Sequence, residues 1–590
     1  MAANADPLQP GERALTYVRN LPGLVGLPEN FYYTISVRYI SDGGNPEAYS
    51  GPPGCCTFTL RPAEIHSPQA RKIESQSTNV DEVFALASAW IKNCLEIHDQ
   101  CDLGIGQSFT LPTRLIDCGD PESSSTQSCR LIETQQTPAA GPYMTLSHCW
   151  GKAHCLKLTQ SNLAQLLAAI PTSTLPPLYQ DAITITRSLG VRYLWIDSIC
   201  IIQDEPQQTD WKKEVTRMGD VYANSMCNIS ALDCQDASYP IFRDRSAAAL
   251  NSPVVETDVH GNGQTAHYLT RDDYAWHYEV VRSTVNSRAW VFQERLLSPR
   301  ILNFGKNEVY WECRCLEASE TRPRGFPGTS ERRPFKGIIG PVGSPRLPLI
   351  PGWNDIVRTY TTAAITFPED RPIAISGIAK MAARWYDDEY VAGLWRSNLA
   401  NDLLWARSDN PASVPGGSAV KQGYTGPSWS WTSCTGPVEF FGNEFGDDMA
   451  KSVLFLVGET HMEGVGGDNI NCGQGSWLSL WGQLKRMTSI NVPGKPWWEC
   501  DVSIGGKHIA VDPEDYMIET RFFCSGRRTR PDGSSLLYAG PPTPRARRGR
   551  IGVAGVFSGE VMDAIVNSSE DAGSLPCLEE KDGKQCIKVF

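Results

Sequence analysis

The chain has 590 residues, of which 41% are hydrophobic and 20% are charged, and this composition excludes a disordered or fibrous protein. A single hydrophobic core rarely organises so long a chain, so about two to four domains are expected. The formal net charge of -12 argues against nucleic acid as a partner, because polyanions bind basic surfaces.

The 19 cysteines are spread at irregular spacing along the chain, which is unlike the framework of a small disulfide-bonded domain. The N-terminal residues MAANADPLQPGERAL lack the basic segment and apolar run of a secretion signal. No apolar run reaches the roughly 20 residues that a membrane-spanning helix requires. Reduced thiols, a cytoplasmic location and no membrane span are therefore expected.

Residues 1–100 are expected to form a first region of short strands and one helix. Gly and Pro residues punctuate alternating segments such as Tyr32 to Ile40, which is typical of strands and turns. From Val80 to His98 (VDEVFALASAWIKNCLEIH), apolar residues recur at helical spacing, and Asp81 and Glu82 fall in the first turn. This pattern predicts a helix.

Two groups of residues that could bind a metal lie far apart in the sequence. Cys94, His98 and Cys101 follow one another at offsets of four and seven, so they share one face of the predicted helix. Cys313 and Cys315 point to the same side of a predicted strand. Neither group has a partner pair of ligands nearby in the sequence. We therefore expect both groups to pack in a core, and we assign no metal site.

Residues 101–320 are expected to form an α/β domain with a mostly parallel sheet and flanking helices. The order of its predicted elements, strand, helix, helix, strand, helix, strand, is typical of that fold class. The run VRYLWIDSICII, from Val191 to Ile202, is nearly all apolar and predicts a central strand buried on both faces. Asp210 is expected to cap the helix that follows. The other elements are strands at 111–118, 143–150 and 226–232 and helices at 159–170, 179–189 and 211–225.

Residues 321–425 are expected to form a linker and a helical region, and residues 426–590 a β-rich region. Helices are predicted at 353–367, 374–386 and 397–405, and shorter alternating segments follow. Arginines between Arg527 and Arg550 flank a Pro/Gly-rich loop, PDGSSLLYAGPPTP. This cluster predicts a solvated basic loop, with a localisation signal or an anion-binding patch as the alternative.

The candidate chemistry of the α/β domain lies near the ends of its strands. Asp197 falls near the carboxyl end of the predicted central strand, where ligands gather in open α/β sheets, although it could equally cap the next segment. Glu214 lies on the following helix, where a lone glutamate is usually solvated. Ser147 and Cys149 flank His148, but adjacent strand residues point to opposite faces and so do not form a nucleophile-base pair by proximity alone.

Several segments in a fixed order carry a family resemblance: AWIKNCLEIHDQC, LPTRLIDC, YMTLSHCWG, LPPLYQDAITITRSLGVRYLWIDSICIIQDE, DWKKEVTRMGDVYANSMCNISAL and SRAWVFQERLLSPRIL. They resemble the motifs of the fungal heterokaryon-incompatibility (HET) domain. The similarity continues through YWEC, DRPIAISGIA, YVAGLW and PSWSW, and so extends over most of the chain. The resemblance implies a fungal protein of the class associated with non-self recognition, in which the HET domain induces cell death.

A more distant resemblance concerns mechanism. HET domains look related to Toll/interleukin receptor-type (TIR) domains, several of which cleave NAD with a glutamate on a helix after a central strand. The segment DWKKEV is similar to the stretch that carries this glutamate, which makes Glu214 the candidate catalytic residue. Ser147, Trp150 and Asp197 would then line the substrate pocket, with Trp150 available to stack on a ring. The glycine-rich nucleotide loop of TIR domains has no clear counterpart, and no P-loop is present.

These resemblances imply an effector of heterokaryon incompatibility and programmed cell death that works through protein partners or self-association. NAD would be a substrate, and no cofactor is expected. Two alternatives remain open. One is a non-enzymatic protein-interaction module of the same pathway, and the other is an accessory or catalytic protein of a secondary-metabolite gene cluster.

Overall fold

The computed structural model describes most of the chain between residues 71 and 440. The described ranges are 71–101, 111–121, 129–137, 139–151, 155–251, 254–257, 266–271, 275–326, 335–338, 351–403, 405–407, 425–427, 429–434 and 436–440, together with residues in and beside strands β1–β3 and β18–β28. The chain divides into two compact units. The first comprises residues 1–214, 221–286 and 298–337, and the second comprises residues 215–220, 287–297 and 338–590.

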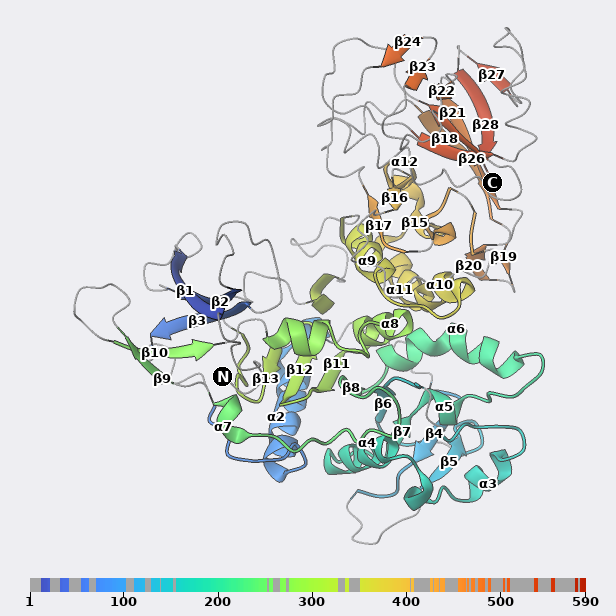
Figure 1. The fold of residues 1–590 in the computed structure, drawn as a ribbon. Helices are drawn as coiled ribbons and strands as arrows, with labels where there is room; N and C mark the ends of the chain where they lie inside the picture. The colour runs from blue at the N-terminus through green and yellow to red at the C-terminus, as the bar shows by residue number, and fades with distance from the viewer. Residues whose placement is uncertain are drawn as a thin grey trace. The chain divides into compact units, whose positions relative to one another are not determined.

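The first unit contains an antiparallel sheet of five strands in the order β1-β2-β3-β10-β9 (Figure 1). Its strands are β1 (Glu12–Leu21), β2 (Tyr32–Ser41), β3 (Cys55–Pro62), β10 (Ala266–Arg271) and β9 (Val254–Thr257). Strands were predicted in the first 80 residues. The pairing of β3 with β10 from much later in the chain was not, because nothing in the local pattern specifies so distant a partner.

The larger sheet of this unit has eight strands in the order β13-β12-β11-β8-β6-β7-β4-β5 (Figure 1). They are β4 (Arg114–Asp117), β5 (Arg130–Glu133), β6 (Tyr143–Ser147), β7 (Tyr193–Trp195), β8 (Cys227–Ala231), β11 (Arg300–Phe304), β12 (Val309–Cys313) and β13 (Glu317–Ser319). The pairs β6-β7, β6-β8 and β8-β11 are parallel. Strands β4 and β12 run antiparallel to this core, and the edge strands β5 and β13 run antiparallel to β4 and β12 in turn. Six of the eight strands therefore run in one direction. The predicted mostly parallel α/β sheet is confirmed.

Helices connect the parallel strands. They are α3 (Leu163–Ala168), α4 (Pro177–Ser188), α5 (Asp197–Cys200) and α6 (Thr209–Ala223), with the short α7 (Ala247–Leu250) further along. The predicted strand from Val191 to Ile202 is wrong in its second half, because β7 ends at Trp195 and α5 begins at Asp197. Apolar residues continue through α5 because this short helix is itself buried, so hydrophobicity alone does not mark the end of the strand.

Helix α2 (Asp81–Ile97) confirms the predicted leader helix, and it packs against β12. Trp90 stacks on Trp311 with 6.0 Å between ring centroids and 24° between ring planes. The Trp90 indole also donates a hydrogen bond of 2.8 Å to the carbonyl of Pro323. The end of α2 is thereby held beside the carboxyl end of β12.

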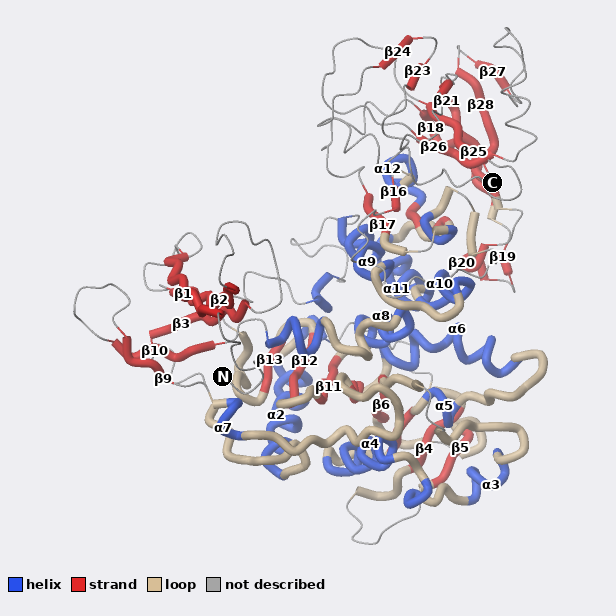
Figure 2. The backbone as a smooth tube through the Cα atoms, viewed as in Figure 1, coloured by secondary structure: helices blue, strands red, loops and turns tan. Residues whose placement is uncertain are grey.

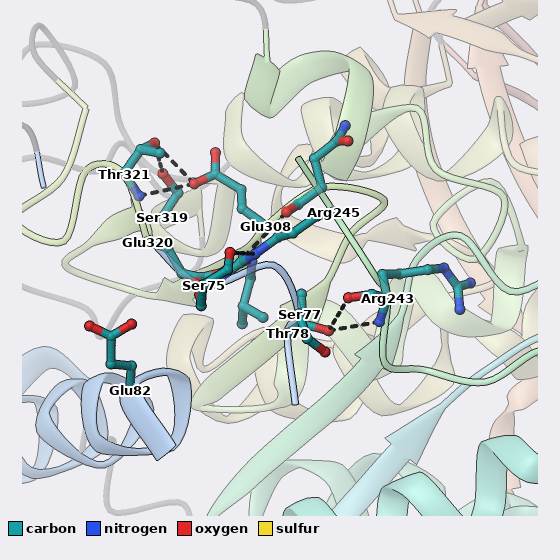
Figure 3. A network of polar contacts seen from close by, with 12 residues as sticks. Ser75, Ser77, Thr78, Glu82, Arg243, Arg245, Glu308, Ser319, Glu320 and Thr321 are labelled. Atoms are coloured by element: carbon teal, nitrogen blue, oxygen red, sulfur yellow. Dashed lines mark hydrogen bonds and ion pairs between the residues drawn. The ribbon is translucent and has the colours of Figure 1, made fainter. Parts of the chain in front are cut away.

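A buried polar network ties three segments of the first unit together (Figure 3). The guanidinium of Arg245 donates to both carboxylate oxygens of Glu320, at 2.5 and 2.9 Å, and to the hydroxyl of Ser75 at 2.7 Å. Glu320 also accepts the backbone amide of Val309 at 2.7 Å. Both charged side chains are almost fully buried, at 0% and 1% exposed. Such a pair contributes to the fold only while both partners are present.

We predict that Glu320→Gln lowers the free energy of unfolding by about 3–5 kcal/mol, because it leaves the buried Arg245 guanidinium without its countercharge. The matched control is Glu82→Gln, which removes a 3.3 Å ion pair with Arg71 whose side chains are 28% and 59% exposed. That substitution should cost about 1 kcal/mol or less. Urea unfolding of the two variants measures the difference, and equal losses would contradict the prediction.

The second unit contains the helical region that was predicted (Figure 2). Its helices are α8 (Ala289–Leu297), α9 (Pro351–Thr361), α10 (Arg371–Ala374), α11 (Ser376–Tyr386) and α12 (Leu399–Asp402). Gly219 on α6 and Gly377 on α11 allow a close approach, since a Cβ at Gly219 would lie 2.8 Å from the Gly377 Cα. The small hairpins β14 (Tyr390–Val391) with β15 (Leu394–Trp395) and β16 (Trp405–Arg407) with β17 (Val438–Phe440) belong to this unit.

The segments YVAGLW and PSWSW of the sequence meet α9 in the core of this unit. Trp353 and Trp431 each donate an indole hydrogen bond to the carbonyl of Gly393, at 2.9 and 2.7 Å. Gly393 has a φ of +95°, and a Cβ there would lie 2.6 Å from the Trp431 ring nitrogen. Gly393 of YVAGLW, Trp431 of PSWSW and Trp353 of α9 therefore join three segments of this unit.

The C-terminal part of the second unit is built from strands, as predicted. They are β18 (Phe455–His461), β19 (Gly464–Val465), β20 (Asp468–Cys472), β21 (Trp477–Gly482), β22 (Met487–Ser489), β23 (Val502–Ile504), β24 (Lys507–Ile509), β25 (Ser535–Ala539), β26 (Val553–Phe557), β27 (Glu579–Lys581) and β28 (Lys584–Val589). The arginines between Arg527 and Arg550 lie outside the described residues, but the predicted loop between them is wrong in part, because its residues Ser535–Ala539 form β25, which pairs with β26. Among the residues that the structure describes, no helix is both long and apolar enough to span a membrane.

Candidate functional site

The chain changes direction across the parallel sheet at β6, which makes the carboxyl ends of β6 and β8 a topological switch point. From β6 the chain crosses to β7 on one side, and from β7 it returns past β6 to β8 on the other. Connections that leave in opposite directions open a crevice at the carboxyl ends of such strands, and ligands of open α/β sheets bind there. The candidate site is therefore the edge at which Ser147 ends β6.

Polar side chains inside the sheet pair with one another between β6 and β8. Thr145 donates a hydrogen bond of 3.0 Å to the Asn228 side-chain oxygen, and the Asn228 amide donates one of 2.9 Å to the Ser147 hydroxyl. All three residues are buried. Ser147 lies at the predicted strand end, but its hydroxyl is engaged in holding β6 to β8.

Trp150 and Asp197 meet at the edge itself, although they follow different strands. The Trp150 indole donates a hydrogen bond of 2.8 Å to Asp197 Oδ2, while Asp197 Oδ1 accepts the backbone amide of Ser198 at 2.7 Å. Both residues are half-buried, and Lys157 lies over the Trp150 ring, 4.9 Å from its centroid. Asp197 is the first residue of α5, so it does not cap the helix from outside, and its two oxygens bind the Ser198 amide and the Trp150 indole.

Behind this pair lies a chain of buried hydroxyl and imidazole groups. His148 Nε2 lies 3.0 Å from the Tyr179 hydroxyl, which lies 2.8 Å from the Ser198 hydroxyl. Burial raises the pKa of the Tyr179 phenol well above its usual range, and the nearby Asp197 carboxylate adds to the shift. Tyr179 therefore stays protonated and can donate one hydrogen bond within the chain.

Gly151 brings the Trp150 segment close to residues 235–236. It has a φ of +59°, and a Cβ at this position would lie 2.2 Å from the Asp236 Cβ and 2.7 Å from the Gln235 carbonyl oxygen. Both the left-handed backbone and the lack of space require glycine. The glycine that ends YMTLSHCWG is therefore required for the position of Trp150 beside it.

Glu214 lies on α6 in a second polar group. Its Oε1 accepts a hydrogen bond of 2.6 Å from the Thr113 hydroxyl, and the residue is only 2% exposed. Arg114 forms a bidentate pair with Asp210, at 3.0 and 2.9 Å. Burial acts to lower the pKa of Arg114, but Asp210 outweighs this and leaves it raised, with Glu214 contributing. Glu214 is therefore not the solvated helix residue that a lone glutamate would suggest.

Asp210 does not cap α6 from outside, as was predicted, because the helix already begins at Thr209. Its carboxylate instead accepts the Arg114 guanidinium and, at 2.8 Å, the backbone amide of Ile202. The charged partner on β4 explains the difference. Arg114 is only 6% exposed, so its charge requires a carboxylate nearby. The apolar periodicity of α6 does not reveal this requirement.

Of the residues predicted to form the site, the structure brings Trp150 and Asp197 together at the strand ends. The Ser147 hydroxyl is hydrogen-bonded to Asn228 inside the sheet. Glu214 accepts a hydrogen bond from Thr113 and interacts electrostatically with Arg114. Sequence reasoning missed Tyr179, Ser198 and Asn228. Ser198 directly follows Asp197 in the motif and could have been included, but the contacts of the other two depend on the tertiary fold.

A third group of reactive side chains lies elsewhere in the first unit. Cys94, His98 and Cys101, at the end of α2, lie with Cys313, at the end of β12, so that their ligating atoms are all within 4.8 Å of one another. The two groups treated separately in the sequence therefore meet.

A model of one protein family matches this edge and its supporting elements. The family is described as heterokaryon incompatibility protein (HET), and the match runs over residues 143–294. The chain carries a HET domain. This segment begins at the first residue of β6 and includes α4, β7, α6 and β8, which form or flank the switch point. No curated protein and no solved structure matches the chain.

Within the HET domain, Gly151→Ala should destabilise the fold more than Gly190→Ala does. Gly190 also has a positive φ, of +72°, but an added Cβ would meet nothing within 4 Å there. Both substitutions carry the cost of a left-handed alanine, about 1–2 kcal/mol, and only Gly151→Ala adds a clash with backbone. Thermal unfolding of the two variants measures the difference. A Gly151→Ala melting temperature equal to that of Gly190→Ala would show that the Trp150 segment is not held against Asp236.

Proposed function

We propose that this chain is an effector of heterokaryon incompatibility and programmed cell death, and that the sheet edge at the carboxyl end of β6 is its working surface. The match of residues 143–294 to the HET family is the observation that carries the proposal. Trp150 follows β6, which borders the topological switch point, and it binds Asp197 at the neighbouring strand end, which supports the choice of surface. Both side chains are half-buried, and they can therefore contact a ligand or partner without unfolding of the domain.

For the chemistry at this edge, we propose cleavage of NAD by self-associated HET domains. Water replaces nicotinamide on the ribose, giving ADP-ribose, nicotinamide and a proton. The departure of nicotinamide leaves an oxocarbenium-like sugar, which a carboxylate can stabilise. The distant TIR resemblance assigns this role to Glu214, with Ser147, Trp150 and Asp197 as substrate-binding residues. The placement of Glu214 on the helix that follows β7 and α5 supports the assignment.

A non-enzymatic interaction module is the second candidate, and a specific observation favours it. Glu214 and Ser147 are 2% and 1% exposed and are hydrogen-bonded within the fold. A carboxylate that stabilises a sugar cation must touch it, so catalysis by Glu214 requires α6 to move away from Thr113. Binding of a partner protein to Trp150 and Asp197 requires no such movement.

Expression in a fungal host distinguishes the two candidates when cell death, protein abundance and cellular NAD are measured together. If the chain cleaves NAD, wild-type protein kills and depletes NAD, and Glu214→Gln lowers nicotinamide release by the purified protein by at least about 100-fold. Glu96→Gln is the matched control, because Glu96 is an exposed glutamate on another helix, α2, and it should behave as wild type.

Two results would contradict these proposals separately. Killing by Glu214→Gln at matched abundance, with NAD unchanged, would exclude NAD cleavage and leave the interaction module. Absence of killing by abundant wild-type protein in a compatible fungal host would exclude the effector function itself.

A further inference from the structure

The end of α2 and the end of β12 bring four metal-ligating side chains together. Their ligating atoms, three thiol sulfurs and one imidazole nitrogen, all lie within 4.8 Å of one another. The Cys313 sulfur lies 3.4 Å from His98 Nδ1. In a tetrahedral zinc site with Zn–S of about 2.3 Å and Zn–N of about 2.0–2.1 Å, sulfur and nitrogen ligands lie about 3.6 Å apart. The spacing of the four side chains is therefore close to that of a zinc site.

The local structure explains why these residues meet. Trp90 and Cys94 lie one helical turn apart on α2, and Trp311 and Cys313 lie two residues apart on β12, so each pair shares a face of its element. Because Trp90 stacks on Trp311, Cys94 lies beside Cys313. After α2 ends, a turn in which the Cys101 amide donates to the His98 carbonyl at 2.8 Å returns Cys101 to the same place.

The charges around the cluster also fit a metal-thiolate centre. Three thiolates, one neutral imidazole and one Zn²⁺ carry a net charge of minus one. Arg314 follows Cys313 and is 4% exposed, and among the described residues its Nε and Nη2 have no hydrogen-bond partner. Arg300 donates to the Cys94 sulfur at 3.7 Å. Thiolates bound to zinc would place negative charge beside these two buried guanidinium groups, which three neutral thiols would not.

We propose that Cys94, His98, Cys101 and Cys313 bind one zinc ion, which joins the end of α2 to the end of β12. Three cysteines and one histidine in a closed tetrahedral arrangement are the ligand set of a structural zinc site, and oxygen-preferring cations do not choose it. On binding, each thiol releases its proton and becomes a thiolate ligand. His98 and Cys313 are 215 residues apart in the sequence, so the ion closes a long segment of chain that includes the whole HET match at residues 143–294.

Cys315 is the neighbour that this assignment leaves out. Its sulfur lies 3.8 Å from the Cys101 sulfur, but the residue is exposed and does not belong to the group of four. Cys315→Ser therefore serves as a control for proximity. Cys200→Ser, which changes a fully buried thiol on α5, serves as a control for loss of a buried cysteine.

Elemental analysis of the full-length protein after dialysis tests the proposal. We expect about one zinc per chain in the wild type, Cys315→Ser and Cys200→Ser, and loss of most of it in Cys101→Ser and Cys313→Ser. A wild-type protein purified with zinc in the medium that holds none would overturn the proposal. Retention of zinc by Cys101→Ser and Cys313→Ser, or its loss from Cys315→Ser, would overturn the ligand assignment.

Two measurements on the wild-type protein test the zinc site even if the variants fail to fold. Cobalt substituted for zinc should give a thiolate charge-transfer band and the intense visible bands of a tetrahedral ion. Alkylation followed by mass spectrometry should modify Cys94, Cys101 and Cys313 only after a chelator is added. Octahedral cobalt spectra, a disulfide between any two of these cysteines, or alkylation independent of the chelator would each contradict the proposed site.

Discussion

Strand β6 is paired in parallel on both sides, and every one of its residues is buried. This constraint determines the arrangement of the HET domain. A buried strand with polar side chains requires partners for them within the sheet, and Asn228 on β8 provides these for Thr145 and Ser147. The first positions that can face a ligand are then those beyond the end of the strand, where Gly151 turns the chain and Trp150 meets Asp197.

Burial separates the residues that build the site from those that can act on a partner. Tyr179 and Ser198 form a chain behind Asp197 and fix the start of α5, while Arg114 and Asp210 join β4 to α6. These are interior polar contacts, which cost stability when broken and specify the arrangement of the edge. Trp150 and Asp197 are half-buried and lie at the strand ends, so they are the residues on which a functional account of the HET domain depends.

Local patterns were sufficient to predict α2, α4, β6 and the parallel core, since these depend on periodicity, Pro and Gly signals and the order of elements. These patterns fail to predict the structure where a contact with a residue far away in the sequence determines it. The end of β7 was misplaced because α5 is as apolar as a strand, and the role of Asp210 depends on Arg114, which lies in a different strand. The cysteines of α2 gave no reason to expect Cys313 beside them, because the stacking of Trp90 on Trp311 is a contact between elements far apart in the sequence.

Saturation mutagenesis of residues 143–294, scored in parallel for cell death and protein abundance, most directly tests whether the strand-end edge is the working surface. Substitutions that abolish killing without lowering abundance should concentrate at Trp150, Asp197 and their exposed neighbours such as Lys157. Substitutions at Ser147, Tyr179 and Asn228 should lower killing and abundance together. If abundance-neutral losses of killing instead gather away from this edge, or if Trp150 and Asp197 tolerate substitution, the edge is not the working surface.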